Sequence, residues 1–527
     1  MHVPLLVTDF LDRAVTLYGE KVAVIDDHKT ITYYQLNERV NQLSKGLTDL
    51  GVQKGEKVAY LAPNTLEMLE GFYGVFQLGA IMVPLNIRLQ PHDYSFILNH
   101  SESKVLLVDQ ELLHLVEPII KELKTVEKII IHNCTEDDNR FINYDTWLTQ
   151  FDSTEYQRPA LEEADVASLL YTSGTTGSPK GVMLTHRNNY LHALSTMHHL
   201  CITDQDTLLH VLPMFHVNGW GSPFSYTANG ATQVMLRKAL PEVIFDKIQK
   251  YGVTVAHMAP TILNSLLEYY GRFQPKIEQN MRVVIAGSAP PPAFVRRVEE
   301  DLGWEFLQVY GMTETTPLIT TSRIRSEQTA LPKEEQYRLK AKAGYAMIGV
   351  QVKVVNDDGN EVAPGANEIG EIITRSNGVM KGYWKNDEAT MDTIRNGWLH
   401  TGDMAIVDEH GHIDIVDRKK DVIISGGENI SSIEVEGVLY EHPAVLEAAV
   451  VSIPHEKWGE VPHAVIVIRE GQTATEEEII KFSREKLAHF KAPKSISFAD
   501  ELPKTASGKI QKVQIRKQFW DSDRLVN

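Results

Sequence analysis

The chain has 527 residues, with 52 lysine and arginine residues against 70 aspartate and glutamate residues, so its formal net charge is −18. Hydrophobic residues make up 43% and charged residues 23%, which is ordinary for a globular protein and excludes a disordered or fibrous chain. The acidic balance argues against nucleic-acid binding, because such binding depends on neutralising phosphates with basic side chains. The length predicts about three or four structural units.

Cysteine usage and the terminal segments favour a cytoplasmic protein. Cys134 and Cys201 form no CxxC pair, so the sequence predicts neither a disulfide framework nor a Cys-rich zinc site. The N-terminal sequence MHVPLLVTDFLDR has no basic segment ahead of a long apolar run, unlike a secretory signal. The C-terminal residues 524–527, RLVN, are not an SKL-type peroxisomal address. The most apolar stretch, 71–85, is shorter than the ~18 residues of a membrane span, which predicts a buried helix leading into a strand.

From residue 22 to about residue 355, short β-rich runs alternate with longer helical patterns. This alternation is typical of an α/β fold with largely parallel sheets whose strands are buried on both faces. The segments 66–79 and 241–251 are predicted as connecting helices. The predicted strands are 57–61, 104–108, 128–131, 167–171, 207–212, 253–258 and 282–286.

The pattern changes after this region, where 349–374 and 411–416 are predicted as short strands joined by turns. The charged cluster DRKKD at 417–421 follows, and beyond it about a hundred residues predict a small α+β domain. Its expected elements are helices at 432–442 and 475–488 and strands at 448–453 and 464–468. We place a domain boundary at the charged cluster, although such a cluster alone is equally compatible with a surface turn.

The segment YTSGTTGSPKG, residues 171–181, follows the apolar run 166–170. Its glycines and hydroxyl residues suit a loop whose backbone N–H groups face an anion, and Lys180 adds a full positive charge. It is not a Walker A loop, because Lys180 is followed by Gly181 and not by serine or threonine. A flexible Gly/Ser linker is the competing interpretation, but a linker rarely begins directly on a buried strand.

With this loop and five later motifs, the chain resembles the adenylate-forming acyl-CoA synthetases, a family that includes firefly luciferase and peptide-synthetase adenylation domains. The motifs occur in the family's order over nearly the whole length. After YTSGTTGSPKG they are GSAPPP at 287–292, VYGMTET at 309–315, GWLHTGD at 397–403, DRKKDVIISGGENI at 417–430 and PKTASGKI at 503–510. The closest resemblance is to the medium- and long-chain fatty-acid ligases and the plant acyl-activating enzymes.

The resemblance implies a fold with a large N-terminal domain, residues 1–417, of layered, largely parallel sheets plus a β-rich subdomain. A hinge at 418–421 and a small mobile α+β C-terminal domain, 422–527, would complete it. The implied reaction joins a carboxylic acid to AMP with loss of pyrophosphate and then passes the acyl group to coenzyme A. ATP, Mg²⁺ and coenzyme A would be required. Two anionic partners must meet in the first step, so charge neutralisation and positioning are expected to dominate catalysis.

The family's functional residues map onto the matching motifs. Glu314 would bind Mg²⁺ together with Thr175, Thr313 would bond the α-phosphate, and Lys509 would contact the carboxylate and the α-phosphate region. Lys420 would be the pivot of a domain rotation that withdraws Lys509 and presents the Ser425–Gly427 loop to coenzyme A. The implied cofactor-binding residues are Thr172, Ser173, Gly174, Thr175, Thr176, Lys180, Gly287, Ser288, Ala289, Tyr310, Gly311, Asp403, Arg418, Ser425, Gly426 and Gly427.

The segment 212–220, LPMFHVNGW, resembles the subgroup that acts on aliphatic acids. The match places His216 at the carboxylate end, with Gly311 and Trp220 lining the acyl site. A medium- to long-chain fatty acid is the expected substrate, but the bulk of Trp220 could shorten the pocket. A short-chain or 3-methylmercaptopropionate ligase therefore stays open. A carrier-protein-loading enzyme shares the nucleotide motifs and a luciferase-type oxygenase shares the adenylation half, so both stay open as well. A non-catalytic nucleotide-binding module ranks last, because such a module is expected to lose Lys509 or Glu314 and both are present. The expected partners are small molecules, with no nucleic acid, no transmembrane segment and a homodimer as one compatible assembly.

Overall fold

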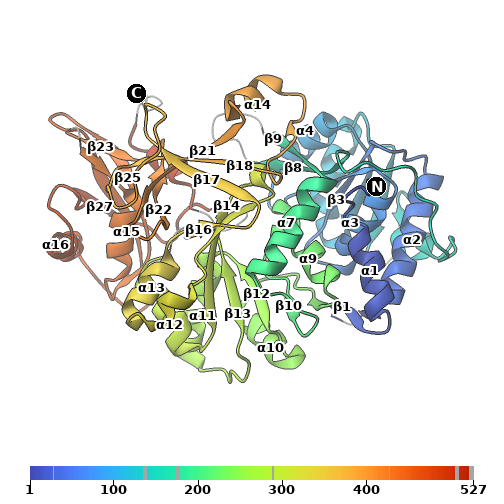
Figure 1. Cartoon of the computed structure of the whole chain (residues 1–527), viewed down its shortest axis with the longest axis horizontal. Coiled ribbons are helices and arrows are strands. Elements are labelled where there is room, and N and C mark those ends of the chain that lie inside the picture. Colours follow the sequence, from blue (N-terminus) through green and yellow to red (C-terminus); the bar gives the residue numbers. More distant parts are fainter. Residues whose placement is uncertain are drawn as a thin grey trace.

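The computed structural model describes residues 1–27, 29–134, 139–172, 179–287, 290–426, 428–504 and 510–520. The large N-terminal domain lies at the right and centre of Figure 1, and the smaller C-terminal domain, in orange and red, lies at the left. Within the described ranges the strands form two large mixed sheets, a smaller antiparallel sheet between them and the C-terminal domain, and a separate C-terminal sheet.

One large sheet has eight described strands and is parallel from β8 through β7, whereas β9 and β19 join it antiparallel. In spatial order they are β19 (Gly382–Tyr383), β9 (Lys180–Thr185), β8 (Val166–Thr172), β4 (Ile81–Pro84), β3 (Lys57–Leu61), β5 (Ser103–Asp109), β6 (Lys128–His132) and β7 (Ile142–Asn143).

The other large sheet has nine described strands and is parallel from β14 through β1. In spatial order they are β16 (Tyr345–Ala346), β15 (Leu318–Thr321), β14 (Glu305–Gly311), β13 (Arg282–Ile285), β12 (Val255–Met258), β10 (Thr207–Leu209), β11 (Thr232–Val234), β1 (Val22–Asp26) and β2 (Lys29–Thr32).

The remaining strands form two smaller sheets. The antiparallel sheet contains β17 (Val350–Val355), β18 (Gly370–Ser376), β20 (Ile394–Arg395), β21 (Trp398–Val407) and β22 (Ile413–Arg418). The C-terminal sheet contains β23 (Ile423–Ser425), β24 (Glu428–Ile430), β25 (Val445–His455), β26 (Gly459–Ile468) and β27 (Ser495–Phe498).

Helices cover these sheets. In the N-terminal domain they are α1 (Asp9–Tyr18), α2 (Tyr33–Asp49), α3 (Leu66–Gln77), α4 (Pro91–Ser101), α5 (Leu113–Val116), α6 (Tyr144–Leu148), α7 (His186–His199), α8 (Val217–Trp220), α9 (Ser222–Ala228), α10 (Pro241–Tyr251), α11 (Pro260–Phe273), α12 (Pro292–Asp301), α13 (Lys333–Ala341) and α14 (Asp387–Thr393). The C-terminal domain has α15 (Ser432–Tyr440), α16 (Glu476–Lys486) and α17 (Lys512–Arg516). The 3₁₀ turns are η1 (Gln110–Leu112), η2 (Glu117–Glu122), η3 (Thr313–Thr315) and η4 (Ser326–Ala330).

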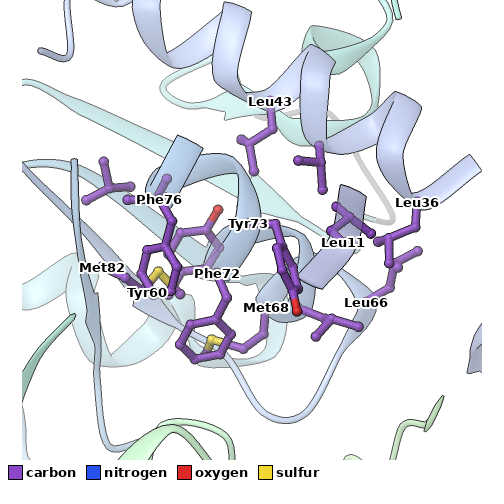
Figure 2. Close-up of a cluster of buried hydrophobic side chains, with 14 of the residues drawn as sticks. Leu11, Leu36, Leu43, Tyr60, Leu66, Met68, Phe72, Tyr73, Phe76 and Met82 are labelled. Carbon is purple, nitrogen blue, oxygen red and sulfur yellow. The ribbon is translucent and has the colours of Figure 1, made fainter. Parts of the chain in front are cut away.

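The main core of the N-terminal domain forms around α3, as Figure 2 shows. Thr65 caps this helix by accepting a hydrogen bond from the backbone N–H of Met68, and every residue of the helix is buried. Phe72 and Phe76 pack near Tyr60 of β3 and Met82 of β4. Burying each large apolar side chain is worth ~1.5–3 kcal/mol. The prediction that the apolar stretch 71–85 is a buried helix followed by a strand is confirmed by α3 and β4.

The predicted strand 207–212 is too long, because β10 ends at Leu209. The amide nitrogen of Asn64 donates to the carbonyl oxygens of both His210 (2.6 Å) and Leu212 (3.0 Å). Its amide oxygen accepts from the backbone N–H of Met214 at 2.7 Å. This side chain therefore takes the place of a neighbouring strand, and the chain leaves the sheet three residues earlier than the apolar pattern indicates.

The C-terminal domain has its own hydrophobic core, formed by residues such as Ile423, Leu439 and Ile466. Ion pairs join it to α11 of the N-terminal domain: Arg469 pairs with Glu268, and Arg272 lies 2.8 Å from Glu470. Among the described residues, no helix combines the length and apolar character needed to cross a membrane.

Candidate active site

Lys180, Tyr383 and Glu314 come from three distant segments and lie in contact. Strand β19 pairs antiparallel with β9, placing Tyr383 opposite Val182 and close to Lys180. The Lys180 ammonium lies 4.9 Å from the centre of the Tyr383 ring, within the range of a cation–π interaction. The Tyr383 hydroxyl donates a hydrogen bond to Oε1 of Glu314 at 2.8 Å. Tyr383 thus connects the end of the glycine-rich segment to an acidic side chain.

Glu314 is a buried carboxylate at the carboxyl end of a parallel strand. It lies in η3, directly after β14, and is 8% exposed, as is the neighbouring Thr313. Burial raises the pKa of Glu314, whereas the hydrogen bond from Tyr383 and the charges of Arg418 and Lys180 oppose this effect. The backbone N–H of Met380 donates to the Glu314 carbonyl oxygen at 2.8 Å, which fixes the turn. Such a position is not that of a solvated surface glutamate.

Tyr310, Asp403 and Arg418 form a second group beside the first. The Tyr310 hydroxyl donates to Oδ2 of Asp403 at 2.6 Å, and Nε of Arg418 lies 3.5 Å from Oδ1 of the same carboxylate. Asp403 and Arg418 are paired directly across β21 and β22. Burial is the main reason why the pKa of Tyr310 is raised well above its usual value, so the hydroxyl stays a donor.

Gly311 is required by a close approach of the backbone. A Cβ atom at this position would lie 1.8 Å from the carbonyl oxygen of Pro317, which accepts from the backbone N–H of Met312 at 3.2 Å. No side chain fits there without moving that turn. The next residue, Leu318, donates its N–H to Nε2 of His192 at 3.3 Å, which links Gly311 to the region around α8.

Residues 217–221 form a left-handed turn, the most unusual backbone in the site. Val217, Asn218, Gly219, Trp220 and Gly221 all have φ between +44° and +75°. Left-handed backbone is unfavourable by ~1–2 kcal/mol for each residue other than glycine and is rare for β-branched or bulky residues. Strain of this kind persists only where the surroundings enforce it and is typical of functional sites.

Contacts with three other elements hold the left-handed turn. The Asn218 amide donates to Ser168 of β8 at 2.8 Å and to Asn189 of α7 at 3.4 Å. The Trp220 ring, 5% exposed, stacks on His257 of β12 with 6.0 Å between ring centres. His216 begins the segment, half-buried, and its carbonyl oxygen accepts from the Gly219 N–H at 2.9 Å. The turn therefore directs Trp220 inward.

The structure places the remaining predicted residues as far as they are described. Thr172 ends β8 opposite Lys180, Gly287 follows β13 with φ +116°, and Ser425 ends β23. Gly426 has φ +61° and lies against Trp458, 2.7 Å from the position of a Cβ atom. Eight predicted site residues lie outside the described ranges: Ser173, Gly174, Thr175, Thr176, Ser288, Ala289, Gly427 and Lys509.

Sequence reasoning missed Tyr383, His192 and His257. Tyr383 lies in the segment KGYWK, which is not among the six motifs, and its role appears only through the pairing of β19 with β9. The pKa of both His192 and His257 is lowered to about 3 by burial, so both imidazoles are neutral. Neither histidine lies in one of the six motifs, so the sequence gives no signal that separates a core position from a site position.

The chemistry of the site fits Mg²⁺ brought in with a nucleotide. Among the described residues no cluster of three or more His, Cys, Asp or Glu side chains could hold a metal by itself. Mg²⁺ is commonly bound through one or two carboxylates together with phosphate oxygens and water, and Glu314 offers one buried carboxylate. Lys180 and Arg418 add positive charge near that carboxylate, as an anionic nucleotide requires.

Fold and site together define an adenylate-forming enzyme with a large and a small domain. The "AMP-binding enzyme" family model matches residues 11–384, and the "AMP-binding enzyme C-terminal domain" model matches residues 434–509. The chain belongs to this family. It is an acid–CoA ligase that acts through an acyl-AMP, and its substrates are a small carboxylic acid, ATP with Mg²⁺, and coenzyme A.

Individual relatives match over almost the full length. A probable CoA ligase, CCL11, of Humulus lupulus is 40% identical, over 97% of this chain and 94% of that protein. The peroxisomal butyrate–CoA ligase AAE11 of Arabidopsis thaliana is 36% identical, over 98% and 93%. The crystal structure of the anthranilate CoA ligase AuaEII with anthranoyl-AMP superposes with a TM-score of 0.90 at 28% identity, covering 98% of both chains. The predicted family and fold are confirmed.

Proposed function

We propose that the ligase activates an aliphatic carboxylic acid and that the two polar groups around Glu314 and Asp403 hold the nucleotide. The observation that carries the proposal is the contact between Lys180, Tyr383 and Glu314. This contact joins a cation at the end of the glycine-rich segment to a buried carboxylate. In that arrangement Lys180 and residues 172–176 bind the β- and γ-phosphates, and Glu314 binds Mg²⁺ together with Thr175.

The second polar group suits the nucleoside. Asp403 has two acceptor oxygens for the ribose hydroxyls, with Arg418 beside it. Tyr310 offers a ring face to adenine, and Gly287, Ser288 and Ala289 permit close backbone approach. Thr313 precedes Glu314 and is assigned to the α-phosphate, with Gly311 and His216 near the acid carboxylate. These roles rest on motif position together with the contacts around Glu314 and Asp403.

The chemistry follows from these charges. A carboxylate oxygen of the acid attacks the α-phosphorus, the bond to the bridging oxygen breaks, and pyrophosphate leaves. The thiolate of coenzyme A then attacks the acyl carbon, and AMP leaves. Bound Mg²⁺ would neutralise phosphate charge. Lys180 and the distant Lys509 would neutralise the remainder, which lets two anions approach.

We infer that the domains divide as 1–417 and 422–527 around a hinge at 418–421. In support, Asp417 and Arg418 still belong to β22, while β23 begins the separate C-terminal sheet at Ile423. Burial and the nearby cations Arg418 and Arg516 lower the pKa of Lys420 to about 8. Rotation at Lys420 would exchange Lys509 for the segment 425–427 at the site, a gating motion between the two half-reactions.

The acid we propose is short to medium in length. A medium- to long-chain fatty acid requires a deep apolar tunnel, but Trp220 is buried against His257 within the cluster of Val217, Val284 and Leu318. The related AAE11 is named for butyrate, which agrees with a short pocket. The related AuaEII is named for anthranilate, an aromatic acid, so an aryl acid is the second candidate.

The test is pyrophosphate release across linear acids from C2 to C18, with benzoate and anthranilate included. We expect the highest kcat/KM at or below about C8, and we expect Trp220→Ala to move the optimum toward longer acids. Trp398→Ala, on the half-buried start of β21, is the matched control and should not change the preference. Long-chain acids preferred by the unmodified enzyme would contradict a short pocket, and an aryl preference would support the second candidate.

We propose a reducing compartment such as the cytoplasm, because Cys134 and Cys201 are not joined in a disulfide and Cys201 is exposed. A peroxisomal location, as in the name of AAE11, is the alternative. Fractionation of cells of the native host, followed with a peroxisomal marker, distinguishes the two locations. Co-purification of the enzyme with that marker would overturn the proposal.

A further inference from the structure

The last described helix, α17, is attached by two cationic side chains to the region around the proposed hinge. Nη1 of Arg516 lies 2.7 Å from Oδ1 of Asp421 and donates to the carbonyl oxygen of Lys420 at 3.1 Å. Nζ of Lys512 lies 2.7 Å from Oε1 of Glu436 on α15 and 2.5 Å from the Ser432 hydroxyl. Sequence motifs pointed to neither residue.

The Arg516 contacts are partly buried. The Arg516 side chain is 14% exposed and that of Asp421 is 10% exposed. Removing one partner of a partly buried ion pair is unfavourable, because the other charge stays partly desolvated without a counter-charge. The guanidinium donates to two acceptors at fixed geometry, which a flexible ammonium reproduces poorly. The contact therefore fixes orientation as well as distance.

The two acceptors lie on one side of the pivot. The carbonyl group of Lys420 belongs to the peptide that follows its Cα atom, and Asp421 follows in turn. Changes in φ and ψ of Lys420 therefore carry both acceptors with the C-terminal side of the chain. Because Arg516 holds both, α17 must turn together with the peptide on which the rotation acts.

The C-terminal domain also holds the described residues before and after Lys509 in place. An antiparallel bridge pairs Lys504 with Ile510, and the Gln511 N–H donates to the Pro503 carbonyl at 2.8 Å. Lys504 also pairs with Glu447 of β25 at 2.6 Å. Ile510 and Gln511 lead directly into α17, so the attachment of Arg516 lies only seven residues beyond Lys509.

We propose that Arg516 is a positioning residue for adenylation: by fastening α17 to the hinge peptide, it makes the residues that directly follow Lys509 turn together with the hinge. The proposal rests on the role assigned above to Lys509. Loss of this attachment lets α17 and the residues before it shift relative to the hinge. An error of about 1 Å in a positioned catalytic group can reduce a rate about a hundredfold.

The experiment compares the two half-reactions in Arg516→Gln, Arg516→Lys, Asp421→Asn and the double variant Arg516→Gln/Asp421→Asn. Pyrophosphate release measures adenylation, and thioester formation from a supplied acyl-AMP measures the second step, with the best acid of the panel. We expect Arg516→Gln to slow adenylation 10- to 100-fold and the second step less than threefold. Arg516→Lys should recover part of the loss, and the double variant should be no slower than Arg516→Gln.

Arg484→Gln, on the exposed face of α16, is the control and should leave both steps unchanged. Equal loss of both half-reactions would overturn the proposal in favour of a purely structural role. The proposal would also be overturned if the rate losses of Arg516→Gln and Asp421→Asn multiplied in the double variant, because the two residues would then act independently. If Arg516→Gln fails to fold, Arg516→Lys and Asp421→Asn still give the ratio of the two steps. The Lys509→Ala variant distinguishes failure of the proposed function from failure of this inference. If Lys509→Ala retains adenylation, the proposed function is contradicted. If Lys509→Ala loses adenylation but Arg516→Gln retains it, only this inference is contradicted.

Discussion

Among the single residues of the site, Tyr383 should orient the carboxylate of Glu314 through its hydrogen bond. We expect Tyr383→Phe to reduce kcat/KM for ATP about tenfold, because a hydrogen bond to a charged group is worth ~1.5 kcal/mol or more. The phenyl ring keeps the contact with Lys180, so the fold should be unaffected. Tyr156→Phe is the matched control, since it removes an exposed hydroxyl pair with Thr48 far from the site. Equal kinetics in both variants would show that the Tyr383 hydroxyl has no such role.

Asp26 should make stability depend on pH. Burial raises its pKa to about 6 from an ordinary value of 3.8, although its carboxylate accepts from the Leu66 N–H at 2.9 Å. The folded state therefore holds the proton more tightly. The stabilising contribution is complete below about pH 4 and is lost as pH rises through about 6, a change of ~3 kcal/mol.

Asp26→Asn keeps an acceptor oxygen and removes the titration. We expect the variant to gain free energy of unfolding over the unmodified protein at pH 7.5 and to lose that advantage at pH 4.5. Denaturant unfolding at both pH values measures the difference. An advantage of the same size at both values would mean that Asp26 does not titrate in this range.

At the scale of elements, the left-handed turn 217–221 depends on Gly221. A Cβ atom there would lie 2.7 Å from Nδ1 of His192, and φ is +75°. Gly252 after α10 has φ +62° with open space around it, so Gly252→Ala measures the backbone effect alone, ~1 kcal/mol. We expect Gly221→Ala to destabilise the protein by a further ~1–3 kcal/mol and to reduce activity, because His192 must move. Similar unfolding free energies for the two variants would contradict this packing.

The sequence predicted the helices and strands whose ends are determined by nearby residues. The predicted helix 241–251 matches α10, where proline stands at the first position and Gly252 ends the helix in the left-handed region. The strand 57–61 matches β3, a continuous apolar run. Where tertiary contacts decide, prediction failed: Asn64 ends β10 from a site 146 residues away.

The site shows the same division. Glu314, Tyr310, Asp403 and Arg418 were predicted because each lies within a contiguous motif that can be recognised in the sequence. The structure brings these four residues together. Tyr383 was missed because it reaches Glu314 through the pairing of β19 with β9, two segments about 200 residues apart. The left-handed turn was unpredictable for another reason: valine and tryptophan avoid positive φ, so no propensity indicates it.

At the scale of the molecule, the ion pairs between α11 and the C-terminal domain should hold the present orientation of the domains. Glu268 pairs with Arg469, and Arg272 lies 2.8 Å from Glu470. Partly exposed pairs are worth ~1 kcal/mol or less each and weaken with salt. Removing both should therefore shift a domain equilibrium without unfolding either domain.

We expect Glu268→Gln/Arg272→Gln to broaden the distribution of distances between the domains, measured by single-molecule energy transfer between dyes on α1 and α16 in a Cys201→Ser background. The unmodified protein in 0.5 M NaCl should approach the same distribution. An unchanged distribution in both cases would show that these pairs do not hold the domains.

If the C-terminal domain supplies the ammonium of Lys509 for adenylation and withdraws it for thioester formation, the two half-reactions must depend on this residue differently. The most direct test is Lys509→Ala, with pyrophosphate release and thioester formation from supplied acyl-AMP measured on the same preparation. We expect pyrophosphate release to fall by at least a hundredfold while thioester formation keeps most of its rate. Equal loss of both reactions, or pyrophosphate release at the unmodified rate, would contradict this expectation.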